Sequence, residues 1–199
     1  GKKINFKISC NGVFQMTGVK FDHQAEDCVK YIWQYIKSAK SMYSFKKPKE
    51  RRLKAIFVIV MHNIDFTLSF KVDREKLDVF INKNTSYVSL LETSLGYTGV
   101  NIKMPIASTE PRTELTQMEE TKNGWKYIKV PYETYLDMLT KKERVKNLKK
   151  PRRNTFLVFQ SGKTIMSGRN ATLMKKPYYE FLNIIKQGFD KIEERLVVS

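Results

Sequence analysis

The sequence predicts an α+β protein in which one structural unit occurs twice. The stretches FKISCNGVFQMTG (6–18) and FLVFQSGKTIMSG (156–168) carry Phe, Gly, Met and Gly at matching positions. Each has a short apolar strand, a turn that contains Gly and a second strand that ends in Gly, which is typical of a β-hairpin. A segment with the apolar spacing of an amphipathic helix follows each hairpin. The repeated unit is therefore strand, turn, strand, helix.

Both helices are predicted from apolar side chains at steps of three and four. The first covers residues 25–39, and Asp22 is its expected N-cap. The second begins at Pro177, because proline suits the first turn of a helix, and runs to residue 196. The expected buried stripe of the first helix is Cys28, Val29, Ile32, Trp33 and Ile36. That of the second is Tyr178, Phe181, Leu182, Ile185, Phe189, Ile192 and Leu196.

Residues 55–72 alternate between apolar and polar side chains and are predicted to form one long strand. Its even-numbered residues are expected to face the helices, and Asn63 and Asp65, which are odd-numbered, to face the other side of the sheet. Asp73 is expected to cap a further helix. The strands predicted after that helix are SYVSLL (86–91) and GYTGVNIKM (96–104).

Charge is the strongest compositional signal, because the 199 residues carry a net charge of +17. Such an excess indicates a polyanionic partner, with nucleic acid as the first candidate and an anionic membrane surface as the second. A merely solubilising surface is the alternative. Two basic runs, at 46–54 and 141–153, are expected to lie in connections and to contact a phosphate backbone rather than bases.

Several classes of protein are not expected. The sequence contains no run of about 18 apolar residues, so no membrane-spanning segment is expected. Cys10 and Cys28 are expected to be reduced in an intracellular protein, and His23 and His62 lack the spacing of metal ligands. Without a carboxylate pair, a nucleophile–base set or a phosphate-binding Gly loop, we expect neither an enzyme nor a cofactor.

The expected organisation has three parts: a first repeat at 1–45, a basic linker at 46–54 and a second repeat at 55–199. Residues 107–153 interrupt the second repeat. They are predicted to form an insertion with a short helix at 133–144 and otherwise a mobile basic loop.

The order strand, helix, four antiparallel strands, long helix, occurring twice, resembles the TATA-box-binding protein (TBP) family. The second hairpin, VMHNIDFTLSF (60–70) and GYTGVNIKM carry the resemblance, which covers about 4–39, 55–104 and 154–192. NGVFQMTG (11–18) is closest to the TBP-like proteins of large nucleocytoplasmic DNA viruses. The family forms a saddle, in which a curved antiparallel sheet faces a widened minor groove and long helices cover the convex back.

The resemblance implies a role for individual residues. Asn63 would read the groove, Phe159 and Tyr97 would be wedges between bases, Lys163 would contact phosphate, and Thr17 and Ser167 would face the groove centre. The full predicted DNA-binding set is Lys7, Gln15, Thr17, Asn63, Tyr97, Lys103, Arg152, Arg153, Leu157, Phe159, Lys163, Ile165 and Ser167.

This sequence departs from the family pattern at three places. Ser9 stands where the first repeat would hold a wedge Phe, and Tyr97-Thr98-Gly99 replaces the aromatic-Pro-Gly corner. Asp65 stands where an apolar groove contact is expected, and a carboxylate is unfavourable near phosphates. The first repeat also begins at its fourth strand.

The function implied is a transcription-initiation factor that binds and bends A/T-rich double-stranded promoter DNA and recruits a B-type initiation factor and a multisubunit RNA polymerase. The alternative is a TBP-like assembly module of a viral transcription complex with weak or no DNA binding. An open sheet edge would also allow a dimer. The implied location is a viral factory in the host cytoplasm, or the host nucleus, with packaging in the virion as a further option.

Overall fold

The chain forms two compact units of mixed α/β structure with antiparallel sheets, which agrees with the α+β class predicted. The computed structural model describes residues 3–39, 52–92, 98–107, 109–110 and 112–195. The first unit consists of Gly1–Ile56 and Gln117–Ile128, and the second of Phe57–Thr116 and Lys129–Ser199. The expected insertion is therefore divided between the two units.

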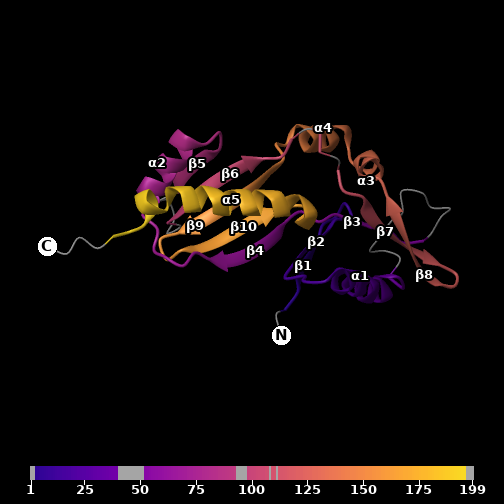
Figure 1. Ribbon diagram of the computed structural model, residues 1–199. Helices are drawn as coiled ribbons and strands as arrows, with labels where there is room; N and C mark the ends of the chain where they lie inside the picture. The colour runs from indigo at the N-terminus through magenta and orange to yellow at the C-terminus, as the bar shows by residue number, and fades with distance from the viewer. Residues whose placement is uncertain (1–2, 40–51, 93–97, 108, 111, 196–199) are drawn as a thin grey trace. The chain divides into compact units, whose positions relative to one another are not determined.

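The second unit is built on a five-stranded sheet with strands in the order β4-β10-β9-β6-β5, and every neighbouring pair is antiparallel. Helices α2 and α5 lie on one side of this sheet (Figure 1). Apart from the insertion between β6 and β9, the order of elements is the one expected for the second repeat. The elements are β4 (His62–Thr67), α2 (Arg74–Asn84), β5 (Val88–Glu92), β6 (Gly99–Pro105), β9 (Arg153–Phe159), β10 (Lys163–Gly168) and α5 (Ala171–Ile192).

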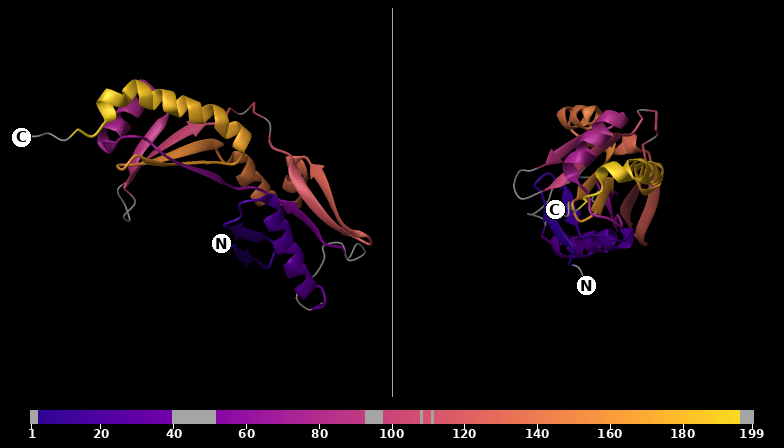
Figure 2. Two further views of the ribbon diagram at one scale, coloured as in Figure 1. Left: turned by 60° about the horizontal axis from the view of Figure 1, so that its bottom comes forward. Right: turned by 60° about the vertical axis from the view of Figure 1, so that its left-hand side comes forward.

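The core of the second unit is made by side chains of the sheet, of α2 and of α5, and Figure 2 shows α5 running along one face of the sheet. Phe156 of β9 stacks on Phe181 of α5, with ring centroids 4.2 Å apart. The two helices approach closely at Gly188, where a Cβ atom would lie 2.6 Å from the Phe80 ring. Side chains with no exposed surface include Leu77, Ile81, Val100, Ile102, Val158, Met166 and Ile192. Burial of this apolar surface is the main source of stability for the unit.

The turn between β9 and β10 is held by the segment that follows β4. Gly162 has φ of 81°, and a Cβ atom on it would lie 2.5 Å from the Phe70 carbonyl oxygen. The Leu68 N–H donates to the Gly162 carbonyl at 2.9 Å, and the Val72 N–H donates to the Gln160 carbonyl at 2.8 Å. Glycine is therefore required here both by the backbone conformation and by the lack of space.

Helix α5 begins six residues earlier than predicted, so the placement of Pro177 in its first turn is wrong. Asn170 is the N-cap, and its side-chain oxygen accepts from the N–H groups of Thr172 and Leu173. Inside the helix, Pro177 has no N–H to donate to the Leu173 carbonyl. Asn154 Nδ2 of β9 donates to that carbonyl at 3.5 Å, which gives the orphaned oxygen a partner.

The first unit contains the first predicted hairpin and helix, both of which are confirmed. The N-cap prediction is wrong, because Phe21 occupies the cap and Asp22 is the first residue of the helix. Gln24 accepts from the Phe21 N–H at 3.3 Å, so a side chain inside the helix makes the capping bond.

The two cysteines of the first unit, Cys10 and Cys28, form no disulfide in the structure. The elements are β1 (Asn5–Ile8), β2 (Phe14–Thr17), α1 (Asp22–Ile36), β3 (Lys54–Phe57), β7 (Leu115–Thr121) and β8 (Gly124–Val130).

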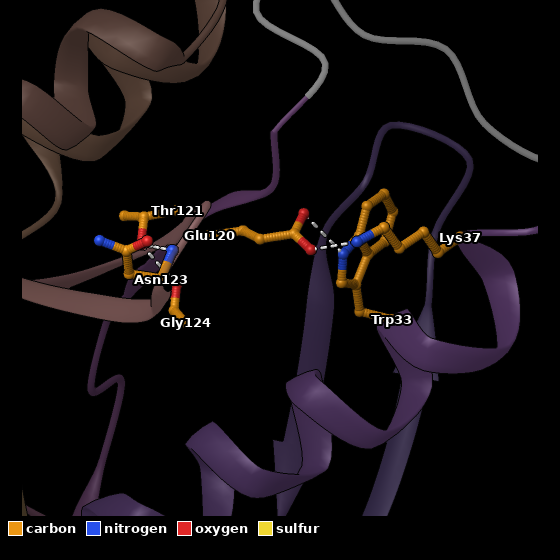
Figure 3. A network of polar contacts seen from close by, with 6 residues as sticks. All are labelled: Trp33, Lys37, Glu120, Thr121, Asn123 and Gly124. Atoms are coloured by element: carbon orange, nitrogen blue, oxygen red, sulfur yellow. Dashed lines mark hydrogen bonds and ion pairs between the residues drawn. The ribbon is translucent and has the colours of Figure 1, made fainter.

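Helix α1 is joined to β7 by a polar cluster around Glu120 (Figure 3). Trp33 Nε1 donates to one carboxylate oxygen at 3.1 Å, and Lys37 forms an ion pair with the other. Burial raises the pKa of Glu120, but the hydrogen bonds from Lys37 and Trp33 outweigh it and lower the pKa overall. Beside this cluster, Thr121 Oγ1 donates to the Gly124 carbonyl at 2.8 Å and closes the β7–β8 turn.

The prediction that the insertion is mostly a mobile loop is wrong, because most of its described residues form strands and helices. The strands β7 and β8 form a sheet in the order β3-β7-β8, and the helices α3 (Tyr132–Met138) and α4 (Lys141–Lys149) replace the single helix expected at 133–144. Two local signals explain the difference. Asn123-Gly124 favours a tight hairpin turn, and Thr140 with Glu143 forms a capping box that begins α4.

The single long strand predicted for 55–72 is also wrong. It is divided into β3, which belongs to the three-stranded sheet, and β4, which belongs to the five-stranded sheet. The alternation continues across the break, and neither Gly nor Pro marks it, so the sequence contains no signal for the change of sheet. The predicted helix capped by Asp73 is confirmed, since the Asp73 side chain accepts from the Lys76 N–H at 3.1 Å.

Candidate nucleic-acid interface

The candidate site is the face of the five-stranded sheet that points away from α2 and α5, called here the open face. Strand alternation places it: Phe156 and Val158 are fully buried against the helices, whereas Leu157 and Phe159, on the opposite side of β9, are half-buried. The register of the strands then aligns the open-face residues in rows across the sheet. Each row contains residues that the sequence predicted to contact DNA.

The first row joins the predicted groove-reading residues directly. Asn63 pairs with Ser167, and the Ser167 hydroxyl donates to Asn63 Oδ1 at 2.9 Å. This bond occupies the amide oxygen of the exposed Asn63 and leaves its NH₂ group, a double donor, available for another partner. The row continues across the sheet through Thr155, Lys103 and Val88.

The second row has an apolar centre with a polar residue on each side. Ile165 and Leu157 form the centre, Asp65 pairs with Ile165 from β4, and Asn101 pairs with Leu157 from β6. Leu90 ends the row on β5 and is 51% exposed. The apolar centre agrees with the contact expected for a minor-groove surface, and the two polar flanks do not.

The third row contains the predicted wedge and the predicted phosphate contact. Phe159 pairs with Gly99, and Lys163 pairs with Thr67. A Cβ atom on Gly99 would lie 2.7 Å from Leu157 Cδ1, so a larger residue here would require the Leu157 side chain to shift. Phe159 therefore has no side chain opposite it on β6. Its predicted partner Tyr97 lies outside the described residues.

The two arginines before and at the start of β9 differ in their surroundings. Arg153 is exposed, and its strand position is on the open face with Thr155 and Leu157. Arg152 is half-buried, and its guanidinium donates to the Glu110 carbonyl at 2.5 Å. Arg152 thus supports a connection within the second unit, a role that the charge pattern alone did not indicate.

The predicted residues of the first repeat lie together on the first unit. Lys7 pairs with Gln15 and Asn5 pairs with Thr17 across the β1–β2 hairpin, and all four are exposed. Their alternation therefore places Lys7, Gln15 and Thr17 on one face of that hairpin, as predicted. Ser9, at the position of the expected wedge, follows the end of β1.

The basic run 141–153 is largely helical, since α4 covers most of it. Lys142, Lys146 and Lys149 are exposed, while Arg144 forms an ion pair with Asp137 at 2.7 Å. A helix holds its charges at fixed spacing, so this segment can present a defined row of cations to phosphates. Most of the other basic run, 46–54, lies outside the described residues.

Asn101 is the residue that the sequence analysis missed. Its Oδ1 atom is buried and makes no hydrogen bond, which is uncommon for a buried polar atom. A signal was available: Lys103 was assigned to the site, and Asn101 is two residues before it in the same strand, hence on the same face.

Comparison of the chain with protein-family models, with curated proteins and with solved structures gave no match. The resemblance to the TBP family therefore stays a prediction. Within the described ranges, the structure contains no group of three or more side chains that could hold a metal ion. No helix of that part of the chain is both long and apolar enough to cross a membrane.

Proposed function

We propose that the chain is a non-enzymatic transcription-initiation factor that binds the minor groove of A/T-rich promoter DNA through the open face and bends it. The observation that carries this proposal is the open face itself, where Asn63, Ser167, Ile165, Leu157 and Phe159 form one continuous surface opposite the helices. The proposed fold is the TBP-like saddle, with the second unit as one of its two repeats.

The chemistry of this face suits the minor groove. A·T pairs present only acceptors there, A N3 and T O2, and the NH₂ group of the exposed Asn63 is a donor. Leu157 and Ile165 can pack against sugars and base edges, and Phe159 has the size and exposure of a wedge that unstacks a base step. The net charge of +17 would supply sequence-independent affinity for the phosphates.

The proposed partners beyond DNA are a B-type initiation factor and a multisubunit RNA polymerase in a viral factory or the host nucleus. They follow only from the family resemblance. The experiment that tests the DNA-binding part is fluorescence anisotropy with an A/T-rich and a G/C-rich duplex across a salt series. We expect tighter binding of the A/T-rich duplex and a steep loss of affinity for both as salt rises.

Two variants that lose the same charge distinguish a specific contribution of the α4 lysines to DNA affinity from the general effect of net charge. Replacing Lys142, Lys146 and Lys149 with Gln should weaken both duplexes by a similar factor, because phosphate contacts carry no sequence information. The control replaces Lys175, Lys176 and Lys186, exposed on α5, with Gln and removes the same charge. Equal losses in the two triple variants would show that α4 has no specific role.

The alternative is a TBP-like assembly module with weak or no DNA binding. Asp65 favours it, since a carboxylate stands on the proposed DNA surface beside Ile165. Exposed apolar side chains on the same face also favour it, because Val88 is 55% and Leu90 51% exposed. If the A/T-rich duplex is bound no better than the G/C-rich one even at low salt, the alternative is preferred.

A further inference from the structure

Asp65 and Asn101 are the two open-face residues that the proposed function does not explain. They lie at the flanks of the second row, on either side of Ile165 and Leu157. Asp65 is exposed, and in the described part of the chain it makes no side-chain hydrogen bond or ion pair. Asn101 Oδ1 has no partner either. The Asp65 carboxylate therefore offers exposed acceptors that have no donor, whereas the unpaired Asn101 oxygen is buried and would have to turn outward to accept a hydrogen bond.

The minor groove contains one donor that such acceptors could use. Every acceptor in the groove repels a carboxylate, but the exocyclic N2 amino group of guanine is a donor, and only G·C pairs carry it. A carboxylate beside this amino group would gain a charge-assisted hydrogen bond, which is about twice as strong as a neutral one. Facing an A·T pair, the same carboxylate would lose water and gain nothing.

We propose that Asp65 is a specificity-determining residue that accepts a hydrogen bond from the guanine amino group of one G·C pair within the otherwise A/T-rich site. This inference rests on the proposed function. Asn101 would be a second acceptor in the row only once its buried oxygen has turned outward. Three strand spacings separate β4 from β6, about 14 Å, so the two residues cannot share one amino group. Asn101 would read a separate position, after rotation of an amide that no hydrogen bond holds in place.

The neighbouring residues make this role for Asp65 chemically reasonable. Asn63 and Thr67 precede and follow it on the same face of β4, and Lys163 pairs with Thr67. The Lys163 ammonium can hold the nearest phosphate and offset the repulsion between that phosphate and the carboxylate. Asn63 would contact an A·T pair as a donor, while Asp65 would contact the adjacent part of the groove as an acceptor. Strand β4 would thus present a donor for the acceptors of an A·T pair and an acceptor for the amino group of a G·C pair.

The test uses three duplexes that differ at one base pair, scanned through the A/T-rich site. Each position holds A·T, G·C or inosine·C in turn, because inosine is guanine without the N2 amino group and leaves the major-groove edge unchanged. We expect one position at which the protein prefers guanine to inosine by roughly tenfold, the discrimination of a good base contact. Asp65→Val should abolish this preference. Asp65→Asn, which keeps an acceptor, should retain part of it.

The control is Glu75→Gln, which removes the same charge from an exposed position on α2, on the helix side of the sheet. It should leave the preference for guanine unchanged. If the protein binds the duplexes but never distinguishes guanine from inosine, the inference is wrong and the proposed function stands. A uniform gain in affinity from Asp65→Val at every position would also overturn it, because Asp65 would then only repel DNA. Failure to bind any duplex would overturn the proposed function itself.

Discussion

The two hairpins of similar sequence have different structural settings. In β9–β10 the inward side chains of Phe156, Val158 and Met166 have no exposed surface, because three further strands complete the sheet and α2 and α5 cover it. In β1–β2, which forms a two-stranded sheet in the described structure, Phe6 is 50% and Ile8 45% exposed. A sequence motif therefore specifies the turn and the pairing, but burial depends on what packs around it. The first hairpin gains little stability from the same apolar residues.

The largest expected difference is in the stability lost when the phenylalanine at the matching position of each hairpin is replaced. Phe156→Ala should lower the free energy of unfolding by about 4 kcal/mol, because it leaves a cavity beneath Phe181. Phe6→Ala, at the matching position, should cost less than about 1 kcal/mol, because half of the side chain is already in water. Urea unfolding followed by far-ultraviolet circular dichroism measures both, and equal losses would contradict the comparison.

The turn glycines should differ by a smaller amount. Gly162→Ala should cost about 3 kcal/mol or more, since the new methyl group meets the Leu68 and Phe70 carbonyls as well as a positive φ. Gly12 has φ of 79°, but a Cβ atom on it would have nothing within 4 Å, so Gly12→Ala should cost only about 1 kcal/mol. Thermal unfolding compares the two variants. Similar shifts in Tm would mean that the positive φ alone, and not the lack of space, sets the cost of the substitution.

The proposed wedges give a test on DNA. Phe159→Ala should remove most of the bend and weaken the A/T-rich complex roughly tenfold, because an inserted ring compensates the unstacking of a base step. Ser9→Ala should change little, as its side chain is too small to act as a wedge. Fluorescence energy transfer across an end-labelled duplex measures the bend. A bend that persists in Phe159→Ala would falsify the asymmetric wedge.

The smallest effect concerns the contact that ties α1 to β7 in the first unit. Glu120→Gln should lower the stability of the unit at pH 7 by about 1 kcal/mol, allowing for the exposure of Lys37. Because the pKa of Glu120 is lowered in the folded state, its contribution is present above its ordinary value of 4.5 and is lost as the pH falls through the folded value. Trp33 and Trp125 both belong to this unit, so tryptophan fluorescence reports its unfolding. A difference between variant and wild type that persists at low pH would contradict this account.

Most of the second unit could be predicted from the sequence because its signals are local. Alternation placed Asn63, Leu157, Phe159 and Ser167 on one face, and the structure has them there. The cap at Asp73 was equally local. The division of 55–72 between two sheets was not predictable, because strand pairing depends on residues far away in the chain. The function of these residues is still a prediction.

The insertion was missed for a different reason. Strand β7 carries mostly polar side chains, and the apolar residues of β8 do not keep a strict alternation, so only Asn123-Gly124 marked a hairpin. Asn170 as the helix cap was overlooked because Pro177 gave a stronger start signal. A proline inside a helix is costly unless the carbonyl four residues before it, which loses its N–H partner, accepts a hydrogen bond from another donor. Here that donor is Asn154, a residue of β9 that no local pattern connects to the helix.

The chain crosses between the two units three times, after Ile56, Thr116 and Ile128. Synthesis proceeds from the N-terminus, so a ribosome completes every residue of the first unit before it makes β9, β10 and α5. The strands β4, β5 and β6 must then wait for the two central strands of their own sheet, while their apolar side chains lack cover. The first unit can thus fold early, whereas the sheet that bears the open face closes last and is the part most open to aggregation during synthesis.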